Sequence, residues 1–123
     1  MATTSTARSS FDMAASSEFE KVCRFEFKPN ERGNPPGKLA DVDLVFTAAP
    51  FAGMVLVGFA VWADAGGQNW TVTMPARQYS VSGEHRSFAL LRGATGREQT
   101  EPLKRAIITA YEAYERDLRA ARR

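Results

Sequence analysis

Cysteine and histidine are nearly absent from this sequence, and their scarcity excludes several kinds of site. The chain of 123 residues has one cysteine, Cys23, and one histidine, His85. A lone cysteine cannot form a disulfide within the chain, which is typical of a protein in the reducing cytoplasm, so we expect a cytoplasmic location. Because a zinc site needs three or four Cys or His ligands, we expect neither a metal nor a cofactor.

Long hydrophobic runs are missing too, and neither sign of charge is in large excess. The longest apolar run, from Met54 to Ala63, has the length of a strand and is far shorter than the roughly 18 residues of a membrane helix. We therefore expect no membrane partner. The 16 Lys and Arg residues exceed the 14 Asp and Glu residues by only two, so global charge does not by itself indicate a nucleic-acid partner.

The first 17 residues contain little that could order them. They are rich in Ser, Thr and Ala, with one Arg and no continuous apolar segment of the kind found in a secretory signal. We expect residues 1–17 to form a disordered tail, because so little apolar surface cannot offset the loss of chain entropy on ordering. Residues 18–123 have the length of a single α+β domain.

Alternation of apolar and polar residues predicts a series of strands. In the first, Cys23, Phe25 and Phe27 share one face, with charged residues between them. The run from Met54 to Asp64 is apolar on both faces, which is typical of a central strand. Gly- and Pro-rich segments separate the strands. The expected strands are residues 21–28, 39–47, 54–64, 69–74 and 86–92, with residues 77–84 as a loop.

The last segment has the signals of one long helix. Thr100 is the expected N-cap, and Pro102 is tolerated in the first turn. An apolar stripe at helical spacing follows, made of Leu103, Ile107, Tyr111 (or Ala110), Tyr114 and Leu118. The predicted fold class is therefore α+β, with an antiparallel β-sheet of four to five strands followed by one long C-terminal helix.

Basic residues gather around the expected loop. Arg77 and Arg86 would lie at its two ends, and guanidinium groups bind phosphate or carboxylate bidentately. The alternative is a solvated rim in which an arginine pairs locally with Glu84. Further arginines crowd the end of the helix, where cations are favoured in any helix. They are Arg116, Arg119, Arg122 and Arg123.

Two short motifs and a helix ending give the sequence a family resemblance. They are, in order, Met74-Pro75-x-Arg77, Gly83-Glu84-x-Arg86 and Ile107…Ala110-Tyr111. Over roughly residues 55–114 the chain resembles the stage V sporulation protein G family, which are small bacterial regulators that pair as dimers. The resemblance implies a homodimer and, if the family's nucleic-acid binding carries over, matches Arg77 and Arg86 to its basic motif positions. Where the family continues with Asp and His-Pro, this chain has Ser87 to Arg92.

These observations favour a small, dimeric regulator that binds DNA or RNA and is not an enzyme, since no nucleophile, base and orienting group can be assembled. A sheet covered by one helix also leaves a face or an edge available to a second copy. The expected nucleic-acid-binding residues are Arg77, His85, Arg86, Arg92, Arg116 and Arg119.

Two alternatives stay open. One is a protein-interaction module whose arginines contact acidic protein surfaces. The other is a single-stranded-DNA-binding protein of the sheet-plus-helix coactivator type, which would stack bases on an exposed Trp62 or Trp70. The more ordinary expectation for these two tryptophans is a cross-strand pair in the core.

Overall fold

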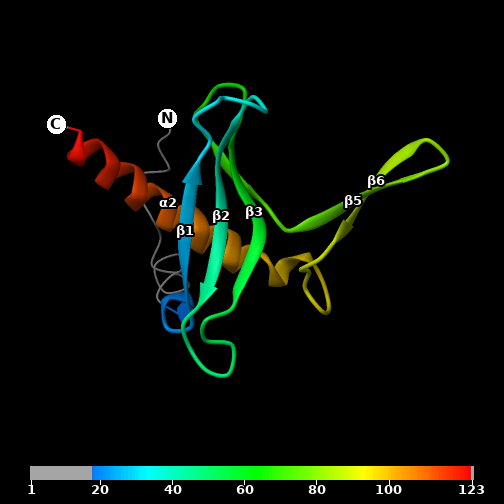
Figure 1. Cartoon of the computed structure of the whole chain (residues 1–123), viewed down its shortest axis with the longest axis horizontal. Helices are drawn as coiled ribbons and strands as arrows, with labels where there is room; N and C mark the ends of the chain where they lie inside the picture. The colour runs from blue at the N-terminus through cyan, green and yellow to red at the C-terminus, as the bar shows by residue number, and fades with distance from the viewer. Residues whose placement is uncertain (1–17, 123) are drawn as a thin grey trace.

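The computed structural model describes residues 18–122, so the predicted tail at residues 1–17 and the final residue, Arg123, lie outside the described part. The chain forms an antiparallel sheet, a protruding hairpin and one long C-terminal helix (Figure 1). This α+β architecture confirms the predicted fold class. The elements are β1 (Cys23–Pro29), β2 (Lys38–Phe46), β3 (Val55–Ala63), β4 (Trp70–Thr73), β5 (Ala76–Val81), β6 (Glu84–Ala89), η2 (Arg97–Gln99) and α2 (Glu101–Ala121).

The first four strands form one antiparallel sheet in the order β1-β2-β3-β4, and helix α2 covers one of its faces. The register places Val42 opposite Phe59 and Val61 opposite Val72, so their side chains share the covered face. Phe59 is fully buried there. The helix completes the core with the predicted stripe, of which Leu103, Ile107 and Tyr111 are buried.

Tyr111 ties the helix to both edge strands of the sheet. Its ring packs edge-on against Phe27 of β1 at 5.2 Å and against Trp70 of β4 at 4.9 Å between centroids. Its hydroxyl donates a hydrogen bond of 2.9 Å to Glu115 one turn later. Burial, followed by this bond to a carboxylate, raises the pKa of the Tyr111 phenol.

Thr100 occupies the N-cap position of α2, as predicted, but its side chain does not cap the helix. The hydroxyl instead donates to the carbonyl oxygen of Arg97, 2.8 Å away, in the short 3-10 turn before the helix. Pro102 lies in the first turn, where a missing N–H costs nothing because no carbonyl precedes it in the helix.

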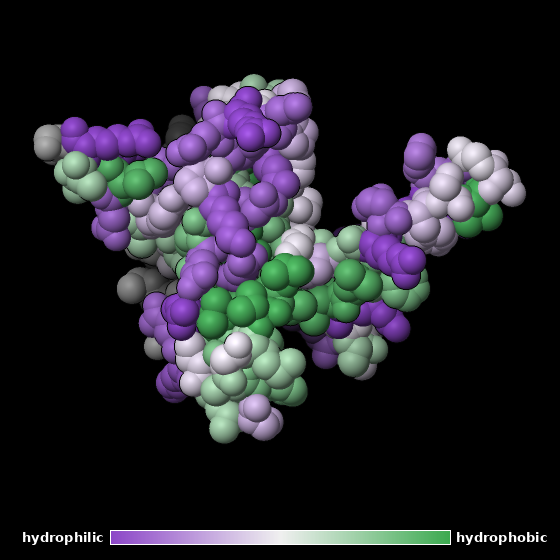
Figure 2. Space-filling model, in the orientation of Figure 1, coloured by the Kyte–Doolittle hydropathy of each residue, from purple (hydrophilic) through white to green (hydrophobic). Residues whose placement is uncertain are grey.

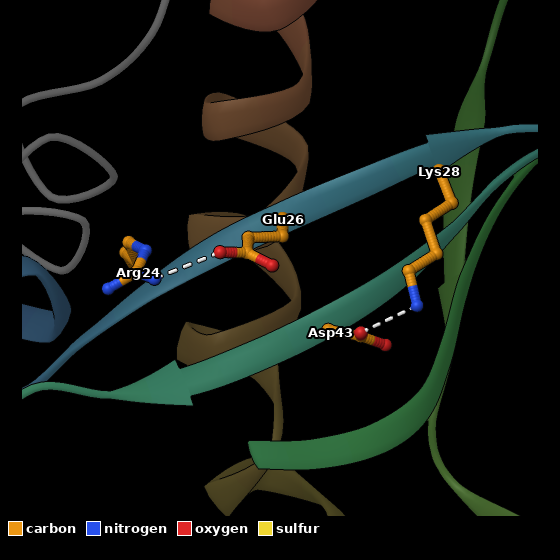
Figure 3. A network of polar contacts seen from close by, with 4 residues as sticks. All are labelled: Arg24, Glu26, Lys28 and Asp43. Atoms are coloured by element: carbon orange, nitrogen blue, oxygen red, sulfur yellow. Dashed lines mark hydrogen bonds and ion pairs between the residues drawn. The ribbon is translucent and has the colours of Figure 1, made fainter. Parts of the chain in front are cut away.

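Within residues 18–122, no helix lies over the other face of the sheet, where charged side chains form ion pairs. Arg24 contacts Glu26 at 2.9 Å and Lys28 contacts Asp43 at 2.8 Å, all on the side turned away from α2, which passes behind the strands (Figure 3). The hydrogen bond that the Lys28 ammonium donates to the Asp43 carboxylate raises the pKa of Lys28. This region of the open face is therefore locally neutralised and offers no free block of charge.

The prediction of a loop between Arg77 and Glu84 is wrong. These residues belong to two paired strands, β5 and β6, joined by a turn of only Ser82 and Gly83. Both turn residues have positive φ, 51° and 82°, as a type I′ turn requires, and the twist of that turn matches the flanking strands. The described chain thus has six strands instead of five, and the strand predicted for residues 86–92 begins and ends earlier.

The prediction that Trp62 and Trp70 form a cross-strand pair in the core is also wrong. Because Val61 lies opposite Val72 on the covered face, Trp70 shares that face while Trp62 points to the open face. There the indole N–H of Trp62 donates to the hydroxyl of Thr73 at 3.0 Å. The two indoles therefore lie on opposite sides of the sheet and cannot form one stacking platform.

The hairpin departs from the sheet at a close approach between Pro75 and Gly58. Gly58 has φ 113° and lies where the pairing of β2 with β3 is irregular. A Cβ at Gly58 would lie 3.1 Å from the Pro75 Cβ, so only glycine lets the two segments meet without displacement. Leu90 closes the base of the hairpin, since its N–H donates to the Pro75 carbonyl at 2.9 Å. The root of the hairpin is therefore anchored to the sheet.

Candidate nucleic-acid interface

The β5–β6 hairpin projects away from the body of the molecule (Figure 1), and residues 76–89 are called the arm below. Every residue of both its strands is exposed. Neither strand adds a side chain to the hydrophobic core. The arm is therefore a surface element whose side chains are available to a ligand on both faces.

The strand register assigns each arm residue to one of two faces. Directly paired residues share a face, and so do alternate residues along one strand. Two hydrogen bonds agree with this assignment, because Arg86 donates to Glu84 at 2.9 Å on one face and Gln78 donates to Ser87 at 3.3 Å on the other. The first face, called the arginine face below, comprises Arg77, Tyr79, Val81, Glu84, Arg86 and Phe88.

The structure brings two of the predicted binding residues together on the arginine face. Arg77 lies opposite Phe88 and Arg86 lies opposite Tyr79, so the arginines occupy diagonal positions. Residues at such positions are about 7–8 Å apart, and their Cβ atoms are somewhat closer. Arg86 pairs with Glu84, as in the alternative of local pairing that the sequence left open. Arg77, in contrast, makes no ion pair within residues 18–122. Arg77 is thus the arm guanidinium most available to an anion.

The other predicted binding residues do not join this pair. His85 pairs with Ser80 and therefore faces the opposite side of the arm. Arg92 is exposed in the connection after β6. Arg116 and Arg119 are exposed near the end of α2, on the far side of the molecule from the arm (Figure 1), and Arg119 lies 3.5 Å from Glu115. One protomer therefore presents these residues at separate places.

Two aromatic residues of the arginine face were not among the predicted site residues. Tyr79 is 39% exposed and lies directly opposite Arg86, while Phe88 is 60% exposed and lies directly opposite Arg77. Interpreting Ser82-Gly83 as a two-residue hairpin turn would have revealed both pairs, because that turn determines the register of the strands. A loop over residues 77–84, as predicted, would have no such register.

A second exposed feature is apolar. Large apolar side chains that are 49% to 60% exposed lie in the connection after β2, in the first half of β3 and directly after β6. Figure 2 shows this hydrophobic surface as a band from the lower end of the sheet to the base of the arm. We call it the apolar strip, and it comprises Phe51, Met54, Val55, Val57 and Leu90.

Within residues 18–122 no three Asp, Glu, His or Cys side chains are grouped to hold a metal ion. Over the same residues, no helix has the length and apolar character needed to span a bilayer. Comparisons with protein-family models, curated proteins and solved structures found no significant match, so no function is inherited from a relative.

Proposed function

We propose that this protein binds nucleic acid through the arginine face of the arm and does so as a homodimer. The observation that carries the proposal is the placement of Arg77 and Arg86 on one face of a fully exposed hairpin. Guanidinium groups bind phosphate through charge-assisted hydrogen bonds, and each contact releases condensed counterions. A local pair of arginines achieves this even though the whole chain has a net charge of only +2.

The stage V sporulation protein G resemblance implies the same two properties. Its basic motif positions correspond to Arg77 and Arg86, and its members pair as dimers. Membership of that family is part of the proposal, supported by the short motifs around Met74-Pro75 and Gly83-Glu84. Each motif contributes one arginine to the same hairpin.

The apolar strip supports the homodimer. Monomeric proteins rarely expose contiguous apolar patches of more than a few hundred Å² unless the patch binds something. Phe51, Met54 and Val57 are each more than half exposed, and two such strips related by a two-fold axis would cover one another. A dimer formed in this way would present two arms, which doubles the number of phosphate contacts available to one nucleic acid.

Fluorescence anisotropy tests the nucleic-acid part. Labelled single- and double-stranded DNA and RNA are titrated with the full chain at two salt concentrations, beside the double variant Arg77→Ala/Arg86→Ala. We expect binding that weakens with salt, and a double variant whose salt slope is smaller by about 1.5 for each arm bound, because every arm loses two phosphate contacts. Arg32→Ala/Arg97→Ala is the matched control, since it removes the same charge from exposed positions outside the arm. No binding of any of the four ligands at low salt would refute this part and leave the protein-interaction module.

Sedimentation equilibrium tests the dimer. Val57→Glu places a charge in the middle of the strip and should convert dimer to monomer. Val81→Glu introduces the same charge at an exposed valine near the arm turn and should leave the dimer intact. A wild-type chain that sediments as a monomer at micromolar concentration would contradict the dimer without affecting the phosphate contacts.

A further inference from the structure

Each arginine on the arginine face lies directly across from an aromatic ring, and this alternation identifies a ligand class. We infer that the arm binds single-stranded nucleic acid, with bases stacked on Tyr79 and Phe88 and phosphates bound by Arg77 and Arg86. This inference rests on the proposed function and specifies which nucleic acid the same face takes. It also adds Tyr79 and Phe88 as binding residues.

The geometry of the pairs is the first support. Directly opposite residues of an antiparallel hairpin have Cβ atoms about 4.5–5.5 Å apart, so each guanidinium starts beside a ring. The two pairs, Arg77 with Phe88 and Arg86 with Tyr79, are neighbours on the same face. Sites for single strands combine these same elements, a positive track for the backbone and aromatic faces for successive bases.

The exposure of the rings is the second support. Phe88 is 60% exposed, and within residues 18–122 neither Phe88 nor Tyr79 stacks on another aromatic ring. The core consists of residues from the four-stranded sheet and α2, to which the arm strands contribute nothing. The rings therefore add nothing to the hydrophobic core, and both remain accessible to a ligand, Phe88 more than Tyr79.

The chemistry of the two arm faces favours a single strand over a duplex. A two-stranded β-ribbon fits the major groove of a duplex, where sequence is recognised by polar side chains at base edges. On the polar face of the arm, one N–H of the Gln78 amide is engaged by the Ser87 hydroxyl at 3.3 Å, and no arginine lies on that face to read guanine. The arginine face offers rings, which can stack only on bases that are not already stacked inside a duplex.

The test compares a labelled 12-nucleotide single strand with the duplex of the same sequence, using the full chain. Tyr79→Leu/Phe88→Leu removes the rings and keeps apolar side chains in the strands. We expect its single-strand affinity to fall by about tenfold or more, since each stacked base contributes substantially to binding. The salt slope should stay unchanged, because both arginines and their phosphate contacts remain.

Controls separate the outcomes. Trp62→Leu removes a partly exposed ring from the open face of the sheet, outside both the arm and the apolar strip, and should leave affinity unchanged. Loss of binding in Arg77→Ala/Arg86→Ala without loss in the ring variant would overturn the single-strand inference and keep the proposed function. Equal or tighter binding of the duplex would do the same. No binding of either ligand would overturn both, and a ring variant that dissociates the dimer would assign the rings to the interface instead.

Discussion

The four-stranded sheet and the arm are both antiparallel, yet the sheet packs one face into the core while no residue of the two arm strands is buried. On the sheet, Val42, Phe59 and Val61 are fully buried beneath α2, whereas all residues of β5 and β6 are exposed. Isolated two-stranded hairpins are marginally stable in water. The sheet is therefore stabilised by its core, while the arm depends on its turn and on its anchor at Pro75. This division leaves the arm side chains free for binding.

The comparison is tested most strongly by removing one phenylalanine from each region. Phe59→Ala should cost about 3–5 kcal/mol of unfolding free energy, because a fully buried ring is replaced by a cavity. Phe88→Ala should cost less than about 1 kcal/mol, because that ring is mostly in solvent already. Urea denaturation followed by circular dichroism measures both. Equal losses would mean that the arm is packed against something in solution.

The junction between the two regions gives the next largest effect. Gly58→Ala should cost about 2 kcal/mol, because alanine at φ 113° is strained and its Cβ would press on Pro75. Gly67→Ala is the matched control, since Gly67 also has positive φ but has no atom within 4 Å of an added Cβ. A thermal melt of each variant compares them. If the two variants lose the same stability, the close approach to Pro75 adds nothing to the cost of the strained backbone.

Alkaline pH should destabilise the protein through Tyr111, which lies in the core beneath the sheet. The pKa of Tyr111 is raised in the fold, first by burial and then by the Glu115 hydrogen bond. Above pH about 10, the ordinary tyrosine value, the unfolded chain loses this proton while the folded chain keeps it, so stability falls as pH rises. Tyr111→Phe should flatten this decline. Unfolding midpoints of the wild-type chain and of Tyr111→Phe at pH 9 and above would show it, and identical pH profiles for the two proteins would contradict it.

The smallest expected effect is local to the arm turn. Ser82 has φ 51°, which is unfavourable for a side chain other than glycine, asparagine or aspartate. Ser82→Gly should relieve this strain and stabilise the hairpin by a few tenths of a kcal/mol up to about 1 kcal/mol. Hydrogen exchange should slow at the β5 and β6 amides while the global unfolding midpoint stays unchanged. A shift of the global midpoint would show that arm and body unfold together.

The covered face of the sheet and the helix were predictable from sequence because their signals are local and periodic. Cys23, Phe25 and Phe27 alternate as a strand does, and Leu103, Ile107 and Tyr111 recur at helical spacing. The arm was missed because both of its strands are fully exposed, so no buried face imposes a clear hydrophobic alternation. Its turn, Ser82-Gly83, also lacks the Asn or Asp that marks most such turns.

The sequence by itself determined the fold class, the inward residues and the presence of Arg77 and Arg86 near one another, because short-range patterns encode which side of each element is buried. Only the tertiary structure decided which side chains share a surface. Strand register paired each arm arginine with an aromatic ring and turned His85 away. The path of α2 carried Arg116 and Arg119 to the far side of the molecule. Pairing between strands depends on turn geometry and long-range packing, which no single segment contains.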